Sequence, residues 1–209
     1  MIQFGYPLYL LIAAVIAIIF GTWHALSKDA KELIVLGPPS SRKKFFFFFF
    51  LRNVKYEPGG TFDKEPFPSF TFKKKNGDSI KIKSGYDYGG QEENIKAYYK
   101  DAICTDAPKA VMFFFSMYSY LNDDSYKRDV IIRLGFIENK FRSQLEKNTF
   151  YLIITYADKV PDFKNQAKEI TNKLKQAYKL TDLLSKANIM VINATNKSHL
   201  ENLKNKMKI

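Results

Sequence analysis

The sequence predicts an α/β protein with a doubly wound, mainly parallel six-stranded sheet and a membrane-spanning helix at its N-terminus. Short apolar runs, such as residues 110–115 and 150–154, alternate with segments of helical length. These runs lack the alternation of a half-exposed strand, so both faces of their sheet should be covered by helices. Ahead of them, the first 27 residues contain no Asp, Glu, Lys or Arg.

That uncharged segment is expected to be a transmembrane anchor. Residues 4–26 are long enough to cross a bilayer as one helix, and Tyr6, Tyr9 and Trp23 lie towards its two ends, where interfacial aromatic residues concentrate. A cleaved signal peptide is the alternative, but a basic leading region and an Ala-x-Ala site are both missing. We therefore expect residues 1–27 to anchor a single-pass protein and residues 28–209 to form its one further domain.

Positive residues on one side of the anchor predict the orientation. Lys28 and Lys31 follow the apolar segment and no basic side chain precedes it, so the domain should face the cytosol. The membrane would be the endoplasmic reticulum in a eukaryote or the plasma membrane in a bacterium. The net charge of +12 favours attraction to anionic lipid. Because the lysines are scattered, contact with RNA or a ribosome is expected to be only indirect.

The first half of the domain should contain three strands, a helix and a long loop. Residues 33–36 form an apolar strand that runs into a loop at residues 37–41, followed by six phenylalanines at 45–50. The phenylalanine run is either a membrane-surface contact or a homopolymer tract tolerated because one helix face packs on the sheet. Residues 52–68 should be an exposed loop. Residues 70–75 and 79–83 flank Asn76-Gly77-Asp78, which predicts a β-hairpin at the antiparallel edge of the sheet.

The second half repeats strand and helix. Strands are expected at 110–115, 150–154 and 189–192, and helices near 92–102, within 125–146, at 162–184 and from 198 onwards. The single cysteine, Cys104, excludes an internal disulfide and agrees with a reducing compartment. Only two histidines are present, so no His/Cys metal cluster is expected.

Polar and glycine-containing motifs follow several of these strands in a fixed order. Residues 37–44 read Gly-Pro-Pro-Ser-Ser-Arg-Lys-Lys, and residues 87–91 read Asp-Tyr-Gly-Gly-Gln. Residues 155–158 read Thr-Tyr-Ala-Asp after the strand at 150–154, and residues 193–195 read Asn-Ala-Thr after the last strand. Taken in this order, the motifs resemble those of the Ras superfamily of small GTPases, in particular its Arf branch.

The resemblance implies a phosphate-binding loop at residues 37–44, where the family has G-x-x-x-x-G-K-[S/T]. Gly37 and Lys43 match this pattern, and Ser41 lies within it. Arg42 replaces the second glycine, whose positive φ and missing side chain allow backbone amides to surround the phosphates. Lys44 replaces the hydroxyl that would bind Mg²⁺. A basic cluster near a helix N-terminus could still hold an anion without metal, and a plain basic loop beside the membrane is the alternative.

The same resemblance assigns roles to the other motifs. Asp87 would hold Mg²⁺ through water, the Gly90 amide would reach the γ-phosphate and Gln91 would orient the attacking water. Ser69 stands where switch I has its metal-binding hydroxyl, with Thr61 and Thr71 as competing candidates. For the base, Asp158 would accept the guanine N–H donors, with Thr155 in place of asparagine, Tyr156 offering a flat surface, and the Ala194 backbone near the guanine oxygen.

The whole layout, an N-terminal span leading into an Arf-like domain, is similar to the β subunits of the signal recognition particle receptor. Bacterial membrane-anchored GTPase-like proteins remain an alternative. The resemblance implies GTP or GDP as ligand, Mg²⁺ as cofactor if the metal site persists, and a cytosolic protein partner that engages the switch regions in protein targeting or trafficking. The altered loop makes hydrolysis less expected than binding. The alternative function is a pseudo-GTPase scaffold that anchors a partner without nucleotide turnover.

Overall fold

The computed structural model describes residues 31–51, 64–90, 98–100, 102–103, 109–145, 149–177 and 180–207. The predicted anchor at residues 1–27 and the predicted catalytic Gln91 lie outside these residues. Within them, no helix is both long and apolar enough to cross a membrane. Lys31–Ile209 forms one compact unit.

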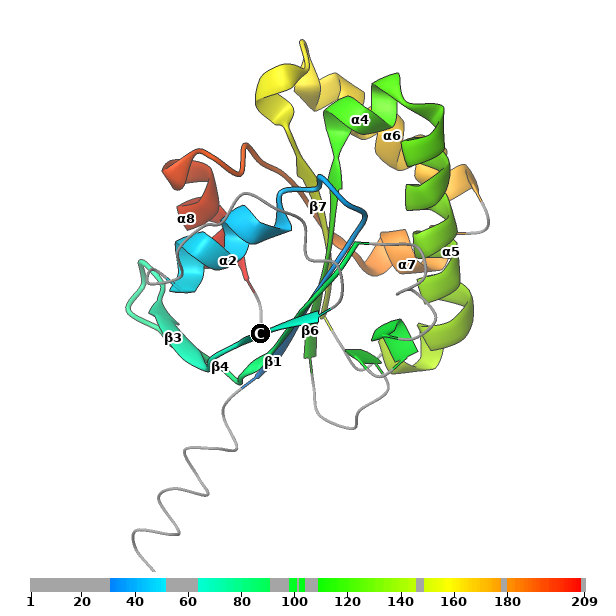
Figure 1. Ribbon diagram of the computed structural model, residues 1–209. Helices are drawn as coiled ribbons and strands as arrows, with labels where there is room; N and C mark the ends of the chain where they lie inside the picture. Colours follow the sequence, from blue (N-terminus) through cyan, green and yellow to red (C-terminus); the bar gives the residue numbers. More distant parts are fainter. Residues whose placement is uncertain are drawn as a thin grey trace, which may run out of the picture. The chain divides into compact units, whose positions relative to one another are not determined.

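A six-stranded sheet forms the centre of this unit (Figure 1). Its strands are β1 (Glu32–Leu36), β2 (Lys64–Phe67), β5 (Gly85–Tyr88), β6 (Lys109–Ser116), β7 (Thr149–Thr155) and β8 (Asn188–Val191). Their spatial order is β2-β5-β1-β6-β7-β8, and every neighbouring pair is parallel except β2 with β5. The predicted α/β class with a mainly parallel six-stranded sheet is therefore confirmed.

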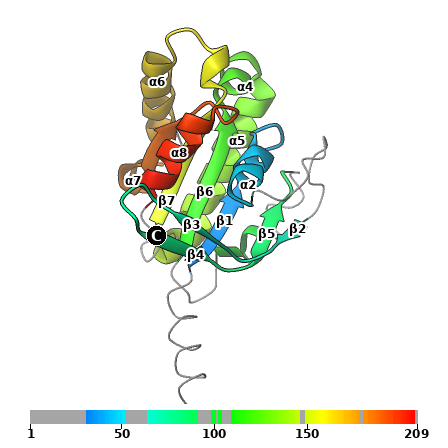
Figure 2. The ribbon, with the colours of Figure 1, turned by 90° about the vertical axis from the view of Figure 1, so that its left-hand side faces the viewer.

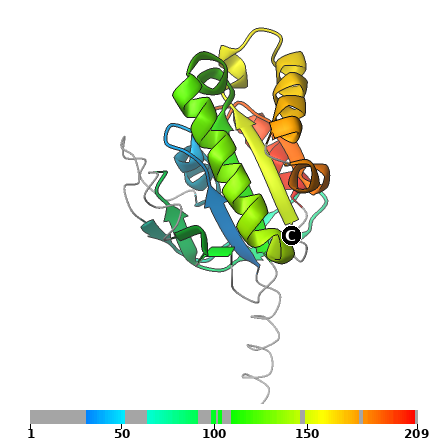
Figure 3. The same ribbon diagram turned by 90° about the vertical axis from the view of Figure 1, so that its right-hand side faces the viewer.

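Helices cover both faces of the sheet. α2 (Lys43–Leu51) and α8 (Lys197–Lys206) pack on one face, against alternate strand residues such as Val35, Met112 and Ile153 (Figure 2). α5 (Asp124–Leu145), α6 (Phe163–Gln176) and α7 (Thr181–Lys186) pack on the other face, which presents Leu36 and Phe113 (Figure 3). Because both faces are buried, the central strands need the continuous apolar runs seen in the sequence.

The predicted hairpin forms, but it is not part of the main sheet. β3 (Phe70–Lys73) and β4 (Ser79–Ile82) form a separate two-stranded sheet, which is linked to the chain just before β1 by a single parallel bridge between Ile82 and Lys31. The hairpin turn places Gly77 at φ 92°. β2 instead provides the antiparallel edge of the main sheet, within a segment that the sequence predicted to be a loop. β2 contains Pro66 and has one buried residue in four, which is why its pattern did not indicate a strand.

The phenylalanine run forms most of α2, and part of it is core. Phe46 is fully buried and its ring lies 5.4 Å from that of Phe114, while Phe47 lies 5.0 Å from Phe67. This agrees with the expectation that one face of the run packs on the sheet. The helix predicted within residues 125–146 is α5, and it follows a short helix, α4 (Met117–Asn122), that the sequence did not predict. One helical prediction needs correction, because residues 162–184 form two helices, α6 and α7.

Candidate functional site

The loop at residues 37–42 leaves the carboxyl end of β1 and enters α2, next to the middle of the sheet. Its first residue, Gly37, has φ 136°, a conformation that residues with a Cβ avoid. A Cβ at this position would overlap the backbone carbonyl of Phe114 on the neighbouring strand β6. The loop is therefore pressed against the sheet where ligands of open α/β folds bind.

Two residues of this loop adopt left-handed backbone conformations although neither is glycine. Ser40 has φ 58° and Arg42 has φ 63°, and Ser41 between them does not have a positive φ. Alternation of left- and right-handed residues turns successive N–H groups towards one side and makes an anion-binding concavity. Arg42 replaces the second loop glycine of the motif, and its backbone nevertheless has the positive φ typical of that glycine.

Lys43, the first residue of α2, folds back over this loop. Its Nζ donates hydrogen bonds to the carbonyl oxygens of Gly37 at 2.7 Å and Pro38 at 3.0 Å, and contacts the Ser41 hydroxyl at 3.4 Å. Burial lowers the pKa of Lys43 to about 8, partly offset by the nearby carboxylate of Asp87. An arriving anion would therefore meet an ammonium group that has exchanged most of its hydration for loop carbonyls.

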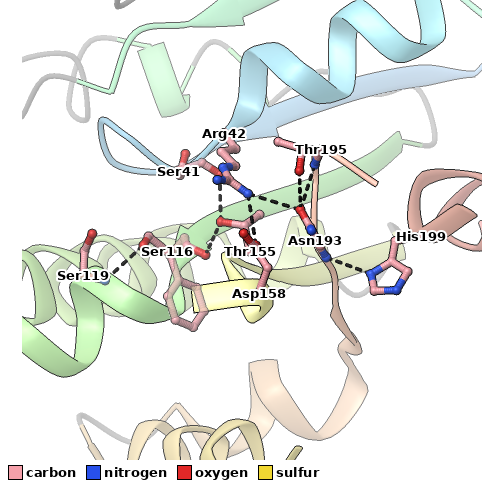
Figure 4. Close-up of polar contacts among 10 residues, drawn as sticks. Ser41, Arg42, Ser116, Ser119, Thr155, Asp158, Asn193, Thr195 and His199 are labelled. Carbon is pink, nitrogen blue, oxygen red and sulfur yellow. Dashed lines mark hydrogen bonds and ion pairs between the residues drawn. The ribbon is translucent and has the colours of Figure 1, made fainter. Parts of the chain in front are cut away.

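Thr155 ties this loop to β7. Its hydroxyl lies 3.1 Å from the Ser41 carbonyl oxygen and 3.0 Å from the Phe115 carbonyl oxygen, and the side chain is fully buried (Figure 4). The sequence assigned Thr155 to the base-binding motif. In the structure its contacts are with the backbone, so it fixes the position of the loop relative to the sheet.

The predicted metal ligands do not come together. Asp87 is 5% exposed on β5, and its strand partner is Glu65. Ser69 lies two residues beyond the end of β2, whose last residue, Phe67, pairs with Gly85, so the strand register does not bring Ser69 level with Asp87. Thr71 lies further away in β3, and Thr61 is outside the described residues.

A lysine occupies the place where the metal-binding hydroxyl was expected. The Nζ of Lys44 lies 3.4 Å from a carboxylate oxygen of Glu65, so a protein cation already faces this carboxylate. Among the residues the structure describes, no three His, Cys, Asp or Glu side chains cluster as metal ligands. A cation in the place of the expected metal-binding hydroxyl does not fit Mg²⁺.

Gly90 is brought to the loop as predicted. A Cβ on Gly90 would overlap the backbone of Pro38 and Pro39, so the two segments are in direct contact. The Gly90 carbonyl accepts a 2.8 Å hydrogen bond from Arg133, which is 1% exposed on α5. Arg133 also donates to Asp129 at 2.7 Å and lies 3.4 Å from the Tyr99 hydroxyl.

Sequence reasoning missed this buried network. Tyr99, whose pKa is raised by burial, also forms a hydrogen bond with the backbone of Gly37, so the network joins the loop, Gly90 and α5. One signal was present in the sequence: Asp129 and Arg133 are four residues apart, as an ion pair on one helix face requires.

Arg42 lies at the end of the site where guanine recognition was predicted. Its Nη1 is 3.3 Å from Asp158 Oδ1 and 3.3 Å from Asn193 Oδ1 (Figure 4). Its guanidinium carbon lies 3.6 Å from the centre of the Tyr156 ring. Ala194, next to Asn193, is 1% exposed, and Asn193 N–H donates to His199 Nδ1 at 2.9 Å.

The structure thus brings most of the predicted site residues to the carboxyl ends of β1, β5, β7 and β8. The loop contains Gly37, Ser41 and Arg42, with Lys43 at the start of α2, and Gly90 lies against it. Asp87 lies near Lys43, and Lys44 contacts Glu65. Thr155 ends β7, Asp158 follows it, and Ala194 follows β8. Ser69 is the described residue that the structure leaves apart.

The fold and the order of these segments define a small-GTPase-like domain. In "The Structure of the Mammalian SRP Receptor", a chain aligns with a TM-score of 0.59 at 14% identity, covering 84% of this chain and 99% of that chain. The signal recognition particle receptor SRb-GTP/SRX complex from Chaetomium thermophilum aligns with a TM-score of 0.56 at 9% identity, covering 78% of this chain and 90% of that one.

At these identities the likeness shows the fold, which confirms the predicted small-GTPase-like architecture of the domain. No family model matches the sequence. No curated protein matches it either.

Proposed function

We propose that the chain is a membrane-anchored module of the small-GTPase type that binds the phosphates of GTP or GDP and recruits a cytosolic protein partner in protein targeting or trafficking. The observation that carries the proposal is the left-handed backbone at Ser40 and Arg42. Such a conformation costs roughly 1–2 kcal/mol per residue outside glycine and is retained where the surrounding structure requires it. We take the strained backbone at Ser40 and Arg42 to serve anion binding by the loop amides, beside Lys43.

Phosphate binding would use the chain's own groups. The loop amides would donate to phosphate oxygens, and Lys43 would turn from the Gly37 and Pro38 carbonyls to the anion. Lys44 would add a second positive charge near the start of α2. The partner proposal is supported by the similarity to the Chaetomium thermophilum structure, which is a complex of SRb with GTP and SRX. Gln91 and hydrolysis form no part of the proposal.

Lys43 provides the direct test of this binding. The full-length chain in detergent micelles should bind GTP, GDP and inorganic triphosphate in a calorimetric titration, with and without a metal chelator. Lys43→Ala should weaken all three by at least tenfold, since charge-assisted hydrogen bonds contribute about 1.5–3 kcal/mol. Lys127→Ala, a lysine on α5, is the matched control. Equal binding by both variants, or none by the wild-type chain, would exclude this phosphate site.

Binding should also weaken as the pH rises above about 8. The free protein has a Lys43 pKa of about 8 because the amine is buried, and a bound phosphate would raise it. Binding above that pH must then take up a proton, so affinity should fall by up to tenfold per pH unit. Titrations at pH 7, 8 and 9 test this. Lys43→Arg should bind with little pH dependence, because arginine stays charged throughout.

The membrane part of the proposal predicts a one-sided protease pattern. Since basic residues follow the uncharged segment, the domain after Lys28 should be digested in intact vesicles whose cytosolic face points outward. Antibody detection of a C-terminal tag, with and without detergent, measures it. A tag protected until detergent is added would reverse the proposed orientation.

A nucleotide-free scaffold is the second candidate, and one specific observation favours it. The Arg42 guanidinium already contacts Asp158 and lies over Tyr156, two side chains that were expected to bind guanine. As a scaffold, the domain would bind its partner in the same conformation with or without nucleotide. Partner affinity measured with GTP, with GDP and with no nucleotide separates the two candidates, because a scaffold binds equally in all three.

A further inference from the structure

The base-recognition end of the site is filled by the chain itself. Arg42 comes from the loop after β1, Asp158 follows β7, and Asn193 follows β8, so three separate segments meet at one guanidinium (Figure 4). The ion pair is substantially covered: the Arg42 side chain is 12% exposed and that of Asp158 is 29% exposed. This is therefore a built contact and not a solvent-exposed arginine lying over a surface.

The guanidinium has the chemistry that a guanine edge would bring. Both are flat, both present N–H donors in the plane, and the N1–C2–N2 edge of guanine is itself a guanidine-type unit. Arg42 lies over the Tyr156 ring at 3.6 Å and directs one nitrogen at the Asp158 carboxylate. Stacking on an aromatic face and donation to a carboxylate are the two interactions that select a purine with N–H donors.

The backbone explains why the side chain reaches this place. Arg42 has φ 63°, the conformation of the glycine that the motif would have there. Asn193 is held by its own turn, in which its Oδ1 accepts from Thr195 N–H at 3.0 Å, so an acceptor is already positioned when the guanidinium arrives. Asp158 follows directly after Tyr156 and Ala157 in a short 3₁₀ turn.

We infer that Arg42 is an internal stand-in for guanine, so that the wild-type chain binds polyphosphate without reading the base, and removal of the Arg42 side chain exposes a guanine-selective site. The inference rests on the phosphate binding proposed above and adds its specificity. A nucleotide base would have to displace the guanidinium from Tyr156, Asp158 and Asn193. Base-independent ligands such as inorganic triphosphate meet no such competitor.

The experiment compares ligand preference in the full-length chain and in Arg42→Gly. Competition against a fluorescent triphosphate probe gives the relative affinities of GTP, ATP and inorganic triphosphate. The wild-type chain should bind the three within about threefold of one another. Arg42→Gly should prefer GTP over ATP by at least tenfold, since glycine keeps the left-handed conformation while emptying the subsite. Adding Asp158→Asn to Arg42→Gly should transfer that preference from GTP to XTP.

Controls make each outcome decisive. Arg128→Gly would weaken α5, so Arg128→Ala is the control for loss of one positive charge at an exposed position. If Arg42→Gly does not fold, Arg42→Asn replaces it, because asparagine also tolerates a positive φ. A wild-type chain that already prefers GTP overturns the inference and leaves phosphate binding intact. Folded variants that bind triphosphate without preferring GTP overturn it as well. Absence of triphosphate binding in every form overturns both proposals.

Discussion

Arg133→Met should lower the free energy of unfolding by about 2–4 kcal/mol, because three acceptors lose hydrogen bonds from a guanidinium that is 1% exposed. Methionine keeps most of the side-chain volume, so the loss measures the hydrogen bonds. Asp129, the Tyr99 hydroxyl and the Gly90 carbonyl would each lose a donor. For a chain of this size the midpoint of thermal unfolding should fall by about 10 °C.

The control for this substitution lies on the same helix. Arg128 is exposed on α5, and Arg128→Met should change the free energy of unfolding by no more than about 0.5 kcal/mol. Urea denaturation followed by circular dichroism measures both variants. If the two substitutions had similar small effects, the network around Arg133 would not contribute to stability as inferred from its burial.

Gly37→Ala should be the most damaging single methyl group in the described part of the chain. The added Cβ would overlap the carbonyl of Phe114, and Gly37 also needs φ 136°. Backbone atoms cannot move aside as the end of a flexible side chain can. We therefore expect the free energy of unfolding to fall by more than about 4 kcal/mol, and little folded protein to be recovered.

Gly77→Ala separates the two causes. Gly77 has φ 92° in the β3–β4 turn, but a Cβ there meets nothing within 4 Å. Gly77→Ala should lower the free energy of unfolding by only about 1 kcal/mol, because the alanine has an unfavourable backbone conformation but no steric overlap. Limited proteolysis and denaturant midpoints compare the pair. If Gly37→Ala were as mild as Gly77→Ala, the loop would not be pressed against β6.

The buried strands could be predicted from the sequence because a strand covered on both faces consists almost entirely of apolar residues. The runs that became β6 and β7 are apolar throughout, since helices cover both faces. The turn at Asn76-Gly77-Asp78 was predictable for a local reason, its backbone preference. What the hairpin pairs with depends on distant residues, and that pairing was predicted wrongly. β2 was missed because an edge strand with one buried residue carries little hydrophobic signal.

The same holds for the candidate site: features that follow from the order of the motifs could be predicted, and features set by tertiary contacts could not. Asp158, Thr155 and Gly90, which come from separate motifs, lie beside the loop because strand ends meet at one edge of a parallel sheet. Residue type misled at Arg42, where tertiary contacts hold a non-glycine residue at positive φ. The register of β2 on β5 does not bring Ser69 level with Asp87, and a strand register cannot be read from a local sequence pattern.

The β3–β4 hairpin is held by residues at the end of α8, and this bears on the order in which the domain folds. Lys74 Nζ donates to the Met207 carbonyl at 2.6 Å, and Lys75 N–H donates to Asn205 Oδ1 at 2.9 Å, across sequence separations of 133 and 130 residues. Contacts between residues so far apart in the sequence have a high entropic cost of loop closure. The hairpin should therefore reach its native position late in folding, after α8 has packed on the sheet.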